Sequence, residues 1–154
     1  MAWFYLITAL AAGAGLSVQA AVNSRLSAGM GGQPLLAALI SFAVGTLCLL
    51  VAALLQSNWS VAAANAAQQP GWRWAGGVIG AGFVFTSVLL APKIGIANTM
   101  FLFILGQLAS SMLIDHFGLI QMPVRPLQWW KFAGMAVMLA GVALFVFGER
   151  WFRP

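Results

Sequence analysis

Five long apolar runs, separated by short polar connections, constrain this chain more than any other feature of its sequence. Each run approaches the ~20 residues that an α-helix needs to cross the hydrocarbon core of a bilayer. A continuous helix also bonds every backbone N–H and C=O internally, which hydrocarbon requires. The sequence therefore predicts an all-α integral membrane protein. We expect a single transmembrane domain over residues 1–154, with approximate spans 2–22, 35–55, 72–91, 95–114 and 129–147.

Composition agrees with a membrane protein and excludes two other classes. Only 6% of the residues are charged and 62% are hydrophobic, whereas soluble domains are about 25% charged. The net charge of +5 is compatible with nucleic-acid binding, but the seven basic residues are scattered and form no patch. One Cys and one His do not supply the clustered ligands of a metal site. We therefore expect the lipid bilayer as a partner, and no nucleic acid, metal or cofactor.

The first apolar run differs from a secretory signal peptide. No Lys or Arg precedes Arg25, and the run is longer than the apolar core of a signal peptide. We expect residues 2–22 to be retained as a transmembrane helix.

Span four carries polar side chains at helical spacing. Gln107, Ser111 and Asp115 follow one another at four-residue intervals and share one helix face. Polar groups within a span usually face a bundle interior or a water-filled cavity. This face is predicted to line a solute pathway through Gln107 and Ser111, with Gln107 near the middle of the span.

Asp115 and His116 lie at the end of span four, close to a membrane interface. One interpretation makes them a gate or a coupling site. The other is structural, with Asp115 paired to a basic side chain or capping a neighbouring helix. Because Asp115 and His116 are adjacent, they point about 100° apart on a helix. A catalytic triad built from them is disfavoured, and the chain is not expected to be an enzyme.

Two amides stand toward the end of span one. Gln19 and Asn23 are four residues apart and so share a helix face. They are predicted to line the solute pathway, or alternatively to make interhelical hydrogen bonds, which contribute about 0.6 kcal/mol on average.

Glycines indicate where helices approach closely. Gly76 and Gly80 form a small-xxx-small pair in span three, which favours close helix packing. Gly134, Gly141 and Gly148 recur at heptad spacing along span five. Packing within the chain and contact with a second chain are both open interpretations of this stripe.

The basic residues give almost no orienting signal. Five spans place the termini on opposite sides of the membrane. Arg73, Arg125 and Lys131 fall on one side, and four basic residues fall on the other: Arg25, Lys93, Arg150 and Arg153. Three against four is what the positive-inside rule predicts for a chain that inserts both ways up. Two copies in opposite orientations then form an inverted repeat.

The whole chain resembles the YdcZ-type family of five-helix proteins in the drug/metabolite transporter (DMT) superfamily. The matching segments are Gln19–Leu26, Ser41–Thr46, Gly76–Gly77, Gly106–Gln107 and Ile114–Gly118. Its second half is more distantly similar to small multidrug resistance proteins. The first helix of those proteins holds a buried Glu that binds protons and cations, whereas span one here has no carboxylate.

The resemblance implies half of a DMT-type inverted repeat that acts as an antiparallel homodimer or pairs with a homologue. The implied function is a secondary transporter or facilitator moving a small polar organic solute across the bacterial inner membrane. The missing carboxylate argues against a proton-coupled cation mechanism. The alternative is a non-transporting membrane subunit that assembles with a partner and stabilises or regulates it.

Overall fold

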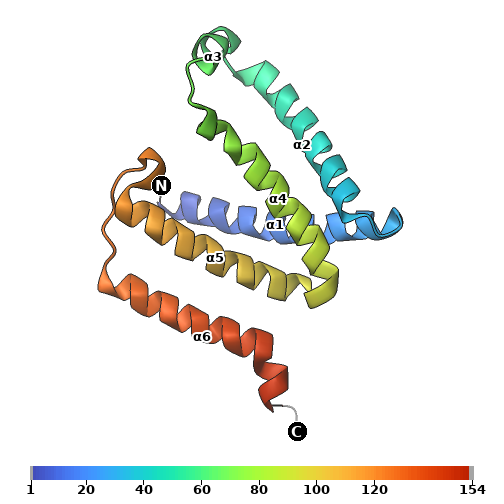
Figure 1. Cartoon of the computed structure of the whole chain (residues 1–154), viewed down its shortest axis with the longest axis vertical. Coiled ribbons are helices and arrows are strands. Elements are labelled where there is room, and N and C mark those ends of the chain that lie inside the picture. Colours follow the sequence, from blue (N-terminus) through green and yellow to red (C-terminus); the bar gives the residue numbers. More distant parts are fainter. Residues whose placement is uncertain (1, 153–154) are drawn as a thin grey trace. The chain divides into compact units, whose positions relative to one another are not determined.

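The computed structural model describes residues 2–152, and these contain helices and connections but no strand. In chain order the helices are α1 (Ala2–Gly29), α2 (Pro34–Gln56), α3 (Trp59–Ala66), η1 (Gly71–Trp74), α4 (Ala75–Ile94), α5 (Ile96–Phe117), η2 (Leu119–Gln121) and α6 (Trp129–Phe152) (Figure 1). Within residues 2–152, five helical segments are long and apolar enough to cross a membrane, with η1 and α4 forming one continuous span. The prediction of an all-α membrane protein with five spans is confirmed.

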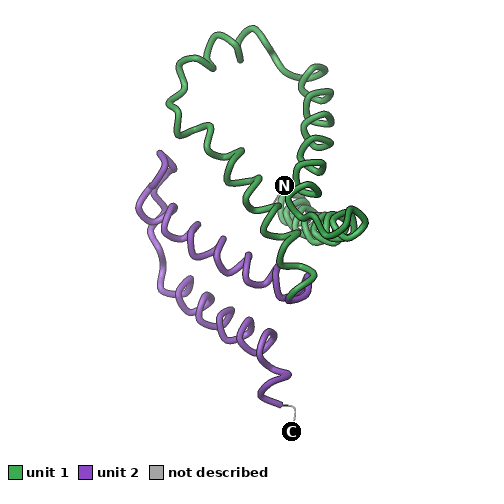
Figure 2. Tube along the Cα trace, turned by 45° about the vertical axis from the view of Figure 1, so that its right-hand side comes forward, with its two compact units in different colours: residues 1–93 green, residues 94–154 purple. Residues whose placement is uncertain are grey.

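The chain forms two compact units, residues 1–93 and residues 94–154, coloured separately in Figure 2. The first unit contains α1 to α4, and the second contains α5, η2 and α6. The single transmembrane domain stays a prediction, and Arg153 lies outside the described residues.

Helix α1 is longer than the sequence pattern predicts. It continues to Gly29 instead of stopping at Val22, so Asn23 and Arg25 are helical and not part of a connection. Arg, Leu and Ala in this segment are good helix formers, which explains the extension. The chain then turns through Gly31 and Gly32, whose φ angles of 74° and 76° are easily reached by glycine.

The core of the first unit is small and lies between α2 and α4. Ala37 and Ala38 of α2 are buried against Val84 and Val88 of α4, and Leu26 and Met30 of α1 pack against this cluster. A Cβ added to Gly80 would lie 3.6 Å from the Phe42 ring, whereas one added to Gly76 would meet nothing within 4 Å. Small side chains therefore let the three helices approach at one level.

The segment between α2 and α4, which connects the predicted spans 35–55 and 72–91, is partly helical. Its residues Trp59–Ala66 form α3, because the Asn58 side chain caps this helix by accepting a hydrogen bond from the Val61 N–H at 3.2 Å. The Trp59 indole N–H donates to the Ala53 carbonyl at 3.1 Å and ties α3 to the end of α2.

In the second unit, α5 packs against α6. The centroids of the Phe101 and Phe145 rings lie 4.4 Å apart, and Val142 of α6 is buried. The glycine stripe of α6 contributes little to packing in this structure. A Cβ at Gly134 or Gly141 would meet nothing within 4 Å, and one at Gly148 would contact only Leu144 of the same helix.

Candidate functional site

A hollow of about 360 Å³ lies between α1, α2 and α4 of the first unit. We call it the amide hollow after Gln19, which lines it from α1. Its other polar and small residues are Ser41, Gly45 and Thr46 from α2, and Gly77 from α4. Thr46 stands near the middle of α2, so hydrogen-bonding groups from two helices converge at membrane depth.

The α2 side of the amide hollow follows from local sequence. Ser41 and Gly45 are four residues apart and share a face, and the glycine leaves space beside the hydroxyl of its neighbour Thr46. Ser41 and Thr46 belong to a segment that resembles the YdcZ-type family, but they are not among the pathway residues predicted from the sequence. Their signal is polar and small residues at helical spacing in an otherwise strongly apolar helix.

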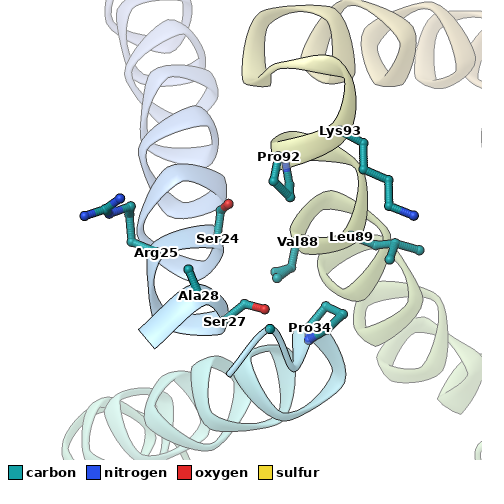
Figure 3. Close-up of a pocket in the computed structure, with 10 residues that line it drawn as sticks. Ser24, Arg25, Ser27, Ala28, Pro34, Val88, Leu89, Pro92 and Lys93 are labelled. Atoms are coloured by element: carbon teal, nitrogen blue, oxygen red, sulfur yellow. The ribbon is translucent and has the colours of Figure 1, made fainter. Parts of the chain in front are cut away.

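A second hollow, of about 380 Å³, lies where α1 ends and α4 ends. We call it the serine hollow because the Ser24 and Ser27 side chains point into it, opposite Val88 and Pro92 (Figure 3). Pro92 lies within the last turn of α4. Two basic residues stand at the margin, Arg25 and Lys93, and their charged ends point outward (Figure 3).

Asn23 lies between the two hollows along α1. Gln19, Asn23 and Ser27 are spaced four residues apart, and the first lines the amide hollow while the third lines the serine hollow. Asn23 is only 4% exposed, and its Nδ2 has no hydrogen-bond partner among residues 2–152.

The unpartnered amide of Asn23 is unusual for a buried polar group. Ser87 of α4 is also buried, yet its hydroxyl donates to the Val84 backbone carbonyl at 2.7 Å. On α4, Val84 lines the amide hollow and Val88, one turn later, lines the serine hollow. The small core containing both valines therefore separates the two hollows.

The predicted pathway residues of span four lie in the second unit. Gln107 and Ser111 are exposed on α5. The Ser111 hydroxyl donates to the backbone carbonyl of Gln107 at 2.7 Å. This bond within one helix satisfies Ser111 locally. A pathway shared by Gln107 and Ser111 with Gln19 and Asn23 stays a prediction.

Asp115 and His116 hold the end of α5 to the following loop. The Arg125 backbone N–H donates to the Asp115 backbone carbonyl at 2.7 Å. The Leu127 backbone N–H donates to the His116 side chain at Nδ1, at 3.2 Å. Gly118 follows the last residue of α5 and ends this helix in the left-handed conformation, with a φ angle of 61°. Within the described part of the chain, no ion pair joins the Asp115 and Arg125 side chains. The gating role of both residues stays a prediction.

Replacing His116 separates its structural role from a gating role. His116→Ala removes the acceptor for the Leu127 N–H, and we expect a loss of about 1 kcal/mol in the free energy of unfolding. His116→Asn keeps an acceptor oxygen near the Nδ1 position and is expected to retain most of that stability. Thermal unfolding in detergent micelles measures both changes. Equal losses in the two variants would contradict the hydrogen-bond assignment, and a stable His116→Asn variant without solute flux would support a gate.

Comparison with known proteins gives one result. A family model described as "Putative inner membrane exporter, YdcZ" matches residues 4–144, which is nearly the whole chain. No curated protein and no solved structure matches.

Proposed function

Because this chain belongs to the YdcZ family of inner membrane exporters, we propose that it is a DMT-type secondary transporter or facilitator for a small polar organic solute. Family membership and the five apolar helices support a multi-pass transporter of the inner membrane. The solute, the coupling and the assembly are the proposed part.

The amide hollow is the observation that carries this proposal. It places Gln19, Ser41 and Thr46 around one space of about 360 Å³ at membrane depth. Hydrocarbon cannot satisfy these groups, so such residues are kept in spans where they line a cavity or bond to one another. Amides and hydroxyls bind a polar solute through hydrogen bonds, and the glycines beside them leave room for it.

We propose that two copies in opposite orientations form the working unit, either as a homodimer or with a homologue. The balanced distribution of basic residues supports dual insertion. Gln107 supports a cover from a second chain, because its amide is exposed on α5, and only 6% of the residues in the apolar stretch of this helix are buried. Gly134 and Gly141 face open space and offer α6 a surface for close helix contact.

Solute flux through purified protein tests the amide hollow. Gln19→Leu keeps the size of the side chain but removes both of its hydrogen-bonding atoms, and we expect flux in proteoliposomes to fall about tenfold or more, as for loss of a strong polar contact. The matched control is Gln68→Leu. Gln68 is exposed after α3, and its side-chain Nε2 donates to the Ala64 backbone carbonyl within the same segment.

Gln107→Leu tests whether the amide on α5 also contributes to the pathway, and it is likewise expected to reduce flux. Unchanged flux in Gln19→Leu would remove the amide hollow from the pathway. Absence of flux for every solute tried with the unaltered protein would favour the alternative, a non-transporting subunit that stabilises or regulates a partner.

A further inference from the structure

The geometry points to Asn23 as a binding group for the acceptor oxygen of a small organic anion, with a carboxylate as the chemical class. This inference rests on the proposed transport function and names the solute class of the same pathway. Three independent observations carry it: the unpartnered amide nitrogen, the basic side chains at the margin of the serine hollow, and the place of Asn23 on α1 between residues that line the two hollows.

Asn23 presents a donor that no group among residues 2–152 satisfies. Its Nδ2 is buried and has no hydrogen-bond partner among the described residues. Leaving a buried polar group unpaired costs about 1–3 kcal/mol, and this cost is retained where the group serves a ligand. An Nδ2 group can only donate, so the complementary solute atom is an acceptor such as a carboxylate oxygen.

Charges in the first unit favour an anion over a cation. Residues 1–93 contain three basic side chains, Arg25, Arg73 and Lys93, and no Asp or Glu. Arg25 and Lys93 flank the serine hollow (Figure 3). Their field raises the local concentration of anions at the mouth and repels cations. The Ser24 and Ser27 hydroxyls supply further donors inside it.

Asn23 lies on α1 between a residue that lines the amide hollow and a residue that lines the serine hollow. Gln19 and Ser27 lie one turn before and one turn after it on the same face of α1, each lining one hollow. The packed core of Ala37, Val84 and Val88 lies at this level. A carboxylate passing from the serine hollow to the amide hollow would therefore exchange the serine hydroxyls for Asn23 and then for Gln19.

Binding tests the inference without requiring transport. In detergent micelles at constant ionic strength, sodium L-lactate and sodium succinate serve as anionic probes, with sodium chloride, glycerol and methylguanidinium chloride as controls. We expect at least one carboxylate to raise the melting temperature of the full chain in a saturable manner, while the three controls do not. No stabilisation by either carboxylate, or equal stabilisation by methylguanidinium, would overturn the inference.

Variants then assign the effect to one amide. Asn23→Ala is expected to weaken carboxylate binding about ten- to hundredfold, the range for loss of a hydrogen bond to a charged group. The control is Asn98→Ala on α5, because the Asn98 Nδ2 is already partnered by the Ile94 carbonyl at 2.8 Å. Unchanged lactate and succinate affinity in Asn23→Ala would overturn the assignment.

Asn23→Asp replaces the hydrogen-bond donor by a negative charge, which repels a carboxylate. In proteoliposomes this variant is expected to lose carboxylate flux and to gain methylguanidinium flux. Carboxylate flux that persists in Asn23→Asp would contradict the inference while leaving the transport function intact. Conversely, carboxylate binding without any flux would contradict the transport function while leaving the binding group intact.

Discussion

Forcing every copy into one orientation is expected to abolish solute flux. Additional Lys residues on one side of the membrane bias which side stays in the cytoplasm. Ser57→Lys with Gln68→Lys adds two charges to the side that holds the connection between α2 and α4. Gly29→Lys with Gln33→Lys adds two charges to the opposite side. If the working unit is an inverted dimer, each double variant alone provides only one of the two required orientations.

Co-expression supplies the control for this experiment. Cells or vesicles that contain both double variants hold both orientations, so flux is expected to return to near its original level. Labelling of Arg150→Cys, in a background where Cys48 is replaced by Ser so that it is the single cysteine, checks that each variant is inserted one way only. Full flux from a variant shown to have a single orientation would contradict the inverted dimer, whereas loss without recovery on co-expression would point to damage by the added lysines.

Gly118→Ala is expected to destabilise the second unit strongly. A Cβ at this position would lie 2.7 Å from Val124 Cγ2 and 3.1 Å from the Met122 carbonyl oxygen, and φ is 61°. The left-handed backbone alone costs an L-residue about 1–2 kcal/mol, and overpacking adds a further 1–3 kcal/mol. We expect a loss of about 2–5 kcal/mol in the free energy of unfolding, measured by denaturation in micelles.

Two further variants identify the cause of that loss. Val124→Ala in the Gly118→Ala background removes the 2.7 Å contact but leaves the backbone conformation and the Met122 carbonyl, so it should recover only part of the stability. Gly106→Ala in the same helix meets nothing within 4 Å and is expected to change stability little. A Gly118→Ala variant as stable as Gly106→Ala would contradict the close packing at the end of α5.

The sequence predicts the spans well because long apolar runs have few alternatives in hydrocarbon. It predicts the ends of helices less well. The predicted first span ends at Val22, yet Leu26 and Met30 pack on the core and α1 continues as a helix to Gly29. Helix α3 was missed because an Ala-rich segment with one capping Asn gives no strong amphipathic pattern.

For the candidate site, spacing along one helix could be predicted but convergence between helices could not. Gln19 and Asn23 were selected because four-residue spacing places them on one face. Ser41 and Thr46 become informative only once α2 is seen to share a hollow with α1. The unpartnered state of Asn23 likewise depends on neighbours from other segments, which no local pattern specifies.

Pro92 has a consequence for hydration. A proline has no N–H, so the carbonyl of Val88, one turn earlier in α4, loses its usual helical donor. Both residues line the serine hollow, and in a membrane a freed carbonyl must be satisfied by another partner. We expect water to fill that role at this end of α4. A solute arriving there would shed its hydration shell gradually, because the wetted hollow offers replacement hydrogen bonds before the dry core is reached.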